Sequence, residues 1–374
     1  MQRGDIFLLC ICLVCALYGV TMVYVTAAGM YHGGWDIANP ARLVLVQVFS
    51  MFLGIGAFVI FTFIDADLIG KQWKWLCLII LALLIALFVF GEDDGTGNKS
   101  WIRFGGIGIQ PSEVIKVIYI VIASYQMSYL KDRGDINSFS SVAQMVAGLL
   151  LVFGAIMVVS SDLGSAAVIL CIFVAMFFAL GVRMYWFAIG GAAAAAAIPL
   201  IWNYFLKDYQ KKRLVAPYNP TSVDPSGYGI TWQTNQSRQS LASGRLTGIE
   251  VGHNSTIFTG KHTDFIFSGI GERLGMIGCI VVLILLTIIV FHCARIGIRS
   301  GRTYDMLICV GVAASVEFQL LINVGMCMGK TPVIGITLPF FSYGGSSMMT
   351  MFAAMGLVSG VKYKPKPQLF SMMY

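Results

Sequence analysis

Asp162 is the residue of this sequence most able to do chemistry in a place where a charge is costly. It lies in the stretch MVVSSDLGSAAVILCIF, between two long apolar runs that leave almost no loop to carry it into bulk water. Two interpretations are open. The carboxylate caps the helix that follows, which the motif alone favours, or it belongs to a functional site, as semi-buried ionisable residues of membrane proteins often do. Three further polar motifs bear on that choice.

The second motif, SWIRFGGIGIQPSEVIKV, places charged residues at the entry to an apolar block. Pro111 suits a first helical turn, so Glu113 and Lys116, three positions apart, share one helix face about a turn into the membrane. Arg103 adds a permanent cation just before them. An ionisable pair at that depth indicates a polar cavity. The alternative is a structural ion pair that offsets its own cost of insertion.

The third motif, KHTDFIFSGIGERLGMIG, gathers His262, Asp264 and Glu272 in one short segment. Such groups serve proton transfer or metal binding, although their spacing matches no standard zinc motif. The alternative is that Thr263 and Asp264 cap the next helix while Glu272 and Arg273 face other helices.

The fourth motif, TPVIGITLPFFSYGGSSMMTMF, combines two prolines with Ser342, Gly344 and Gly345. This composition predicts non-helical chain at membrane depth, which is tolerated only where it is buried in protein or lines a cavity. A helix-start turn capped by serines is the alternative, and it explains the glycines better than it explains the whole segment.

Long apolar helices must position these motifs. The chain is 57% hydrophobic and 11% charged, which is too little polar surface for a soluble globule. Its apolar blocks are long enough to span a bilayer as helices, which excludes a β-barrel. All nine cysteines lie in apolar blocks, so neither a disulfide framework nor a zinc site is expected. We therefore predict an all-α integral membrane protein, a single domain over 1–374 that forms a polytopic bundle of about ten transmembrane helices. The predicted spans are 6–28, 43–64, 75–90, 112–129, 142–160, 164–181, 186–205, 269–293, 306–328 and 343–361.

The distribution of basic residues orients the bundle. With the N-terminus inside, twelve lysines and arginines fall in cytoplasmic segments and four in short outer loops, so the positive-inside rule predicts that both termini are cytoplasmic. The long loop 206–268 is then extracellular and net basic, and the short basic tail 362–374 is cytoplasmic. A basic outer loop either attracts an anion such as phosphate or is an ordinary solvated surface. The twelve are Arg3, Lys71, Lys74, Lys131, Arg133, Arg183, Arg295, Arg299, Arg302, Lys362, Lys364 and Lys366, and the four are Arg42, Lys99, Arg103 and Lys330.

All four motifs fall on the outer side of this map, so we expect them to assemble one outward-facing site. No ATP is available there, and a reaction must therefore use a substrate that arrives already activated. The stretch GEDDGTGNKS is not a phosphate-binding P-loop, because its glycine spacing before Lys99 is wrong. We expect neither a nucleotide cofactor nor a nucleic-acid partner.

Together the motifs resemble the SEDS family (shape, elongation, division and sporulation), whose members include RodA, FtsW and SpoVE. WIRFGGIGIQPSEVIK resembles the family's RWI-x-x-G and QPSE-x-x-K segment, SDLGSA its PDLGTA, HTDFIFSGIGERLGMIG its HTDFIF-x-x-x-x-EE-x-G-x-x-G, and LPFFSYGGSS its LPF-x-SYGGSS. The likeness covers nearly the whole chain, and the loop sequence WQTNQSRQSLASGRLTG is also similar. Three departures are Ser161 for the motif proline, Arg273 for the second glutamate, and Ser100 for an arginine before the tryptophan.

The resemblance implies a peptidoglycan glycosyltransferase of the bacterial cytoplasmic (inner) membrane that polymerises lipid II at the outer face, for cell elongation, division or sporulation. It implies a class B penicillin-binding protein as the transpeptidase partner, and it makes Asp162 the catalytic carboxylate. The donor linkage would invert, and the lipid-linked pyrophosphate that leaves calls for cations such as Arg103 and Lys116. A divalent ion, Mg²⁺ or Mn²⁺, is the one cofactor considered. The other cavity residues carried over are Glu113, His262, Asp264, Glu272, Ser342, Gly344 and Gly345.

A flippase or transporter of the same lipid is the alternative function, because intramembrane ionisable residues also mark transport pathways. Motifs gathered on one side, with no internal repeat, argue against alternating access at the midplane. For the partner's membrane helix we expect a lipid-facing groove of small residues on the last three spans. Those residues are Gly311, Ala313, Ala314, Gly356 and Gly360.

Overall fold

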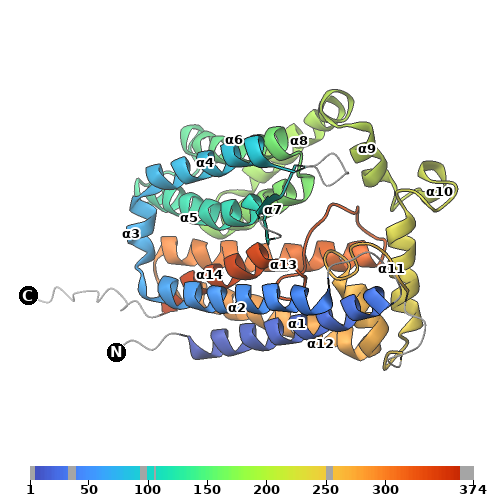
Figure 1. The fold of residues 1–374 in the computed structure, drawn as a ribbon. Helices are drawn as coiled ribbons and strands as arrows, with labels where there is room; N and C mark the ends of the chain where they lie inside the picture. Colours follow the sequence, from blue (N-terminus) through green and yellow to red (C-terminus); the bar gives the residue numbers. More distant parts are fainter. Residues whose placement is uncertain (1–4, 33–38, 93–98, 105–106, 250–255, 363–374) are drawn as a thin grey trace, which may run out of the picture.

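The computed structural model describes residues 5–32, 39–92, 99–104, 107–249 and 256–362. Long helices dominate it, and a short antiparallel hairpin of β1 (Ile102–Phe104) and β2 (Ile107–Ile109) divides the first helices from the rest (Figure 1). The helices before the hairpin are α1 (Ile6–His32), α2 (Pro40–Phe63), α3 (Ala66–Lys71) and α4 (Trp73–Phe90). Those after it are α5 (Pro111–Asp132), α6 (Phe139–Ser160), α7 (Leu163–Leu180), α8 (Met184–Leu200) with the π-helical turn η1 (Ile201–Phe205), α9 (Asp208–Val215), α10 (Pro220–Val223), α11 (Trp232–Ser243), α12 (Ile266–Ser300), α13 (Thr303–Cys327) and α14 (Gly345–Lys362).

Most of these helices have the length and composition of membrane spans. Within the described residues nine are long and apolar enough, namely α1, α2, α4 to α8, α12 and α13, while α14 is apolar but shorter. Large apolar side chains point outward, such as Val158 at 84% and Phe88 at 70% exposed, which is favourable against lipid rather than water. The prediction of an all-α polytopic membrane protein is confirmed, and each of the ten predicted blocks overlaps one of these ten helices.

Helices α2 and α14 pack closely because glycines let their backbones approach. A Cβ atom at Gly356 of α14 would lie 2.6 Å from the carbonyl oxygen of Phe58 on α2, and one at Gly360 would lie 3.1 Å from that of Phe61. In return, a Cβ at Gly54 of α2 would lie 2.8 Å from the ring of Phe352. A larger side chain at any of these glycines would therefore push the two helices apart.

The prediction that small residues of the last spans form a groove for a partner's helix is wrong, because these residues pack against helices of this chain. Gly356 and Gly360 face α2, and Gly311 of α13 faces α5, where an added Cβ would meet the Ile120 side chain at 2.7 Å. Ala313 and Ala314 are 7% and 8% exposed. Small residues in an apolar helix indicate a close approach, but the sequence does not say which helix makes it.

The two ends of the bundle are formed by different parts of the chain. At one end α1 begins and α14 ends, and the Asp5 N–H donates to Ser359 Oγ at 2.9 Å. At the opposite end lie the helices of the long loop, α9, α10 and α11, which we call the outer end (Figure 1). Loop 206–268 is thus largely folded, and α11 packs on α12. The predicted basic tail lies outside the described residues beyond Lys362.

Candidate active site

Asp162 sits in the turn between α6 and α7, where it caps α7. Its Oδ1 accepts the Ser165 N–H at 3.0 Å, and its Oδ2 accepts the Ser165 hydroxyl at 2.7 Å. The residue is only 5% exposed. The capping interpretation of the motif is therefore confirmed, and it does not by itself exclude a further role for the carboxylate.

Two side chains from the start of α5 also point at this carboxylate. Ser112 Oγ and Gln110 Nε2 each lie 3.4 Å from Asp162 Oδ2, at the long end of the hydrogen-bond range. Ser112 Oγ is also 3.0 Å from Ser165 Oγ. The first and second motifs therefore meet at Asp162. Oδ2 is surrounded by donors, whereas Oδ1 accepts one hydrogen bond among the described residues. Because a carboxylate has about four lone-pair sites, Oδ1 can accept a further hydrogen bond or a proton.

Ser161, which stands where the resembling family has proline, adopts a left-handed conformation with φ 55°. Its N–H donates to Met157 O at 3.2 Å. Its carbonyl accepts Gln210 Nε2 and its hydroxyl accepts Lys207 Nζ, each at 3.4 Å. Ser161 therefore ties the Asp162 turn to the start of α9, in a geometry that proline cannot adopt because its ring fixes φ near −65° and removes the N–H.

Restoring the motif proline with Ser161→Pro should destabilise the protein by about 3 kcal/mol or more, because it forbids the native φ and deletes a hydrogen bond. The measurement is thermal unfolding of the purified protein in detergent. Ser161→Gly is the control, since glycine accepts the left-handed region. An unchanged unfolding temperature for Ser161→Pro would mean that the turn does not need this conformation.

Glu113 and Lys116 form the ion pair that their spacing predicts. Lys116 Nζ lies 2.8 Å from Glu113 Oε1, and each side chain is 5% exposed. Glu113 Oε2 is buried and has no hydrogen-bond partner among the described residues. The pair is held in the protein interior one residue from Ser112, so it borders the Asp162 cluster rather than open water.

Arg103 occupies a different setting, on the outer hairpin. It lies in β1 opposite Gly108 of β2, and its guanidinium is 3.5 Å from Glu92. Both side chains are more than half exposed, so this pair contributes at most about 1 kcal/mol. Arg103 therefore remains able to exchange Glu92 for an incoming anion.

Glu272, expected in a cavity, is instead fully buried in α12. It pairs with Lys261, whose side chain is 2% exposed, and it contacts the Ser240 hydroxyl of α11. Its Oε1 accepts the Thr256 N–H at 2.9 Å. Glu272 thus anchors the segment that precedes α12. Sequence reasoning missed Lys261 and Ser240 because pairs separated by 11 and 32 positions are set by the tertiary fold.

The third and fourth motifs lie against each other. The Tyr343 N–H donates to His262 O at 3.0 Å, and the Ser342 hydroxyl donates to Thr263 O at 2.7 Å. Burial lowers the pKa of His262 to about 4, so the ring is neutral at physiological pH, and its Nδ1 has no partner among the described residues. Asn323 of α13 holds Asp264, two residues after His262, by donating its side-chain N–H to Asp264 O at 2.7 Å.

The segment before α14 is non-helical, as predicted. Gln47 of α2 accepts the Gly344 N–H at 3.1 Å and donates to Ser342 O at 3.0 Å. Gly345 packs so closely on α2 that a Cβ would lie 2.6 Å from Ser50 Oγ. Buried side chains from α2 therefore satisfy this backbone, as the apolar surroundings require.

Residues 334–336 of this non-helical segment lie between Asp162 and Asp264, the two acidic residues of the site. A Cβ at Gly164, two residues after Asp162, would lie 2.5 Å from Ile334 O. A Cβ at Gly335 would lie 3.7 Å from Asp264 Oδ2, and Gly335 has φ 70°. Asp162 is buried and Asp264 is half-buried. The four motifs thus converge at the outer end, as expected from the sequence.

The candidate active site does not offer the side chains that a divalent ion needs. Among the described residues there is no group of three histidine, cysteine, aspartate or glutamate side chains that could hold a metal. The Asp162 carboxylate is already engaged by Ser165. The residues present therefore do not fit such an ion, and the mechanism proposed below uses none.

A polytopic helical bundle with a polar site at its outer end, beneath a folded loop, defines a multi-pass membrane protein with an interfacial site. The chain belongs to the FtsW, RodA and SpoVE family of cell cycle proteins, whose family model matches residues 6–366. It is 29% identical to the probable peptidoglycan glycosyltransferase FtsW of Geobacter metallireducens, over 98% of this chain and 96% of the relative. It is 30% identical to the stage V sporulation protein E of Bacillus subtilis, over 96% of each.

A solved structure shares the fold along almost the whole chain. It belongs to work on the structural coordination of polymerization and crosslinking by a peptidoglycan synthase complex, and the match has a TM-score of 0.79 and 26% identity. It covers 97% of this chain and 98% of that one. The chain is thus a multi-pass protein of the bacterial inner membrane.

Proposed function

We propose that this protein is a peptidoglycan glycosyltransferase that polymerises lipid II at the outer face of the cytoplasmic membrane. The observation that carries the proposal is the convergence of four polar motifs around Asp162 and Asp264 at one end of an otherwise apolar bundle. The names of the relatives, peptidoglycan glycosyltransferase among them, supply the reaction class. The outward orientation rests on the positive-inside distribution of lysine and arginine.

In the reaction, the C4 hydroxyl of one lipid II attacks C1 of the sugar at the end of the growing strand. One C–O bond forms as the bond from C1 to the diphosphate breaks, with inversion at C1, and the diphosphate leaves on its lipid. The hydroxyl proton passes to a carboxylate, for which general-base catalysis gives about 10²–10⁴-fold. The developing negative charge on the diphosphate is stabilised by cations at the same rim, with Arg103 the exposed candidate.

Asp162 is the first candidate for the base, because it matches the family motif and keeps acceptor capacity on Oδ1. Asp264 is the second, because residues 334–336 separate it from the Asp162 turn and it is the more exposed of the two. Substitution of each carboxylate in turn separates the two assignments.

Purified protein in detergent, given lipid II and no ATP, should produce glycan strands that a muramidase digests. Polymerisation without a nucleotide is expected because the diphosphate linkage is already activated. A flippase would move lipid II between leaflets of a vesicle and make no strands. Translocation without any polymer would therefore contradict the proposed function.

We also propose a transpeptidase as the partner of this protein. Glycan strands need a transpeptidase to crosslink them, and a class B penicillin-binding protein, the partner that the family resemblance implies, fits that need. The matched structure's description, which joins polymerization with crosslinking in one complex, supports the pairing. The small residues of α13 and α14 are excluded as its docking surface by their packing within this chain.

A further inference from the structure

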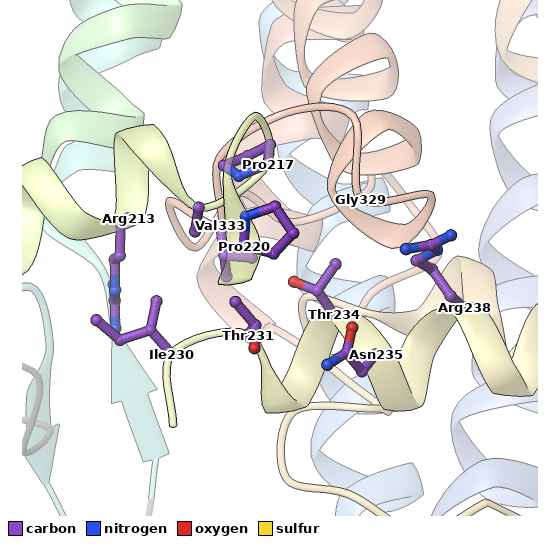
Figure 2. Close-up of a pocket in the computed structure, with 11 residues that line it drawn as sticks. Arg213, Pro217, Pro220, Ile230, Thr231, Thr234, Asn235, Arg238, Gly329 and Val333 are labelled. Carbon is purple, nitrogen blue, oxygen red and sulfur yellow. The ribbon is translucent and has the colours of Figure 1, made fainter. Parts of the chain in front are cut away.

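A small cavity at the outer end has no part in the site described above. It measures about 40 Å³ and lies between α9, α10, α11 and the chain that follows α13 (Figure 2). Figure 2 shows Arg213 of α9 on one side and Arg238 of α11 on the other, with Thr234 and Asn235 on the helix face between them. Four hydrogen-bond donors of the long loop therefore surround one hollow.

These donors have no acceptor within the described part of the chain. No carboxylate lies within ion-pair distance of Arg213 or Arg238 among the described residues, and the side chains of Thr234 and Asn235 make no hydrogen bond there. The Arg213 guanidinium lies 5.7 Å from the centre of the Tyr209 ring, an attraction that leaves its N–H groups available. Two unneutralised guanidinium groups beside polar donors form a site suited to an anion.

Asp224, the acidic residue bonded to the cavity residue Thr231, already accepts hydrogen bonds from its own turn. Asp224 accepts the Thr231 hydroxyl at 2.8 Å and the Gly229 N–H at 2.8 Å through the same oxygen. The Thr231 hydroxyl bond, the largest cause, lowers the pKa of Asp224 to about 2. Asp224 therefore stays ionised and shapes the α10–α11 turn, without pairing with either arginine.

The wall of the cavity connects it to the candidate active site. Val333 lines the cavity, and the next two residues are Ile334, which packs on Gly164, and Gly335, which packs on Asp264. Helices α9, α10 and α11 lie beyond the outer ends of the spanning helices (Figure 1). The cavity and the surroundings of the two carboxylates therefore share residues 333–335, and the helices that form the cavity lie beyond the outer ends of the spanning helices.

This placement selects among the anions of the substrate. The diphosphate is bonded to the lipid and must remain at the membrane surface, whereas the peptide stem on the sugar carries carboxylates and extends outward. We propose that the Arg213–Arg238 cavity binds a carboxylate of the peptide stem of lipid II, an inference that rests on the proposed function. Planar guanidinium groups match a carboxylate in two-point hydrogen bonds, and the apolar walls at Pro217, Pro220 and Val333 suit the methyl group of a terminal alanine.

The test uses full-length protein in detergent and a water-soluble N-acetylmuramyl pentapeptide that ends in D-alanyl-D-alanine. Calorimetry should show binding that Arg213→Gln and Arg238→Gln each weaken about tenfold or more, the scale of one hydrogen bond to a charged group. Amidation of the terminal carboxylate should weaken binding to the unsubstituted protein in the same way. Lys212→Gln is the matched control, because this exposed neighbour on α9 does not line the cavity.

Inorganic diphosphate serves as the competing probe. If the double arginine variant lost diphosphate binding and kept peptide binding, the cavity would belong to the leaving group and the proposal would be overturned, as it would be if the peptide did not bind at all. The double variant should unfold close to the wild-type temperature, since neither arginine forms an ion pair among the described residues and Arg213 loses only its attraction to the Tyr209 ring. If the peptide bound in an arginine-dependent way but the protein made no glycan, the proposed function would fail. The assignment of the cavity as a peptide-carboxylate site would still hold.

Discussion

Replacing Glu272 by glutamine is expected to destabilise the protein by about 3–5 kcal/mol, because it leaves the Lys261 ammonium buried without its counter-charge. The two side chains are 2% and 0% exposed, so water cannot take the place of the lost carboxylate. Lys261 also donates to Thr256 O at 2.6 Å, which links the pair to the chain that leads into His262 and Asp264. The measurement is unfolding of the purified protein by heat or denaturant.

Two controls separate the buried charge from the substitution itself. The double exchange Lys261→Met with Glu272→Gln should recover most of the lost stability, since it removes both charges. Glu92→Gln breaks the exposed pair with Arg103 and should cost at most about 1 kcal/mol. If Glu272→Gln were as stable as Glu92→Gln, the buried pair would not anchor the segment.

Asp162→Asn is expected to lower the rate of glycan polymerisation by about 10²–10⁴-fold, the usual contribution of a general base. Asparagine still caps a helix well, so the Ser165 N–H keeps an acceptor and the protein should remain folded. Asp162→Ser is a second capping replacement with no carboxylate. The measurement is the initial rate of strand formation from lipid II, with thermal unfolding recorded for each variant.

Asp264→Asn is the paired experiment, because Asp264 is the other carboxylate beside residues 334–336. Near wild-type rates for both Asp162 replacements would mean that Asp162 only caps α7 and is not the base. A large loss confined to Asp264→Asn would then assign the base to Asp264. Loss in both would indicate that the carboxylates act together on one substrate.

The helices and the meeting of the motifs could be predicted because both follow from local pattern. Apolar blocks longer than a bilayer fix the spans, and basic residues fix which ends of the helices share a side. That was enough to place Glu113, Asp162, His262 and Gly344 at one end before any contact was known. The Glu113–Lys116 pair was predictable for the same reason, since a helix brings positions i and i+3 together.

Contacts between distant parts of the chain could not be predicted in this way. Glu272 gives no sign in the sequence that Lys261 neutralises it. Its place among the charged residues of the third motif predicts a cavity residue, whereas the structure buries its side chain beside Lys261. Gly356 carries the same signature whether it faces α2 or a partner's helix. Ser161 was recognised as a departure from the motif, but its left-handed φ depends on the way that α6 ends and on contacts from α9.

The proposed function places the polymerisation of lipid II at the outer end of this chain. Proteoliposomes whose orientation is established by protease cleavage of the folded loop 206–268 test it most directly, with lipid II supplied in one leaflet and no nucleotide. Muramidase-sensitive strands are expected when lipid II is in the leaflet beside that loop, and none when it is held in the opposite leaflet. Strands formed only from the opposite leaflet, or transfer of lipid II between leaflets with no strands, would contradict it.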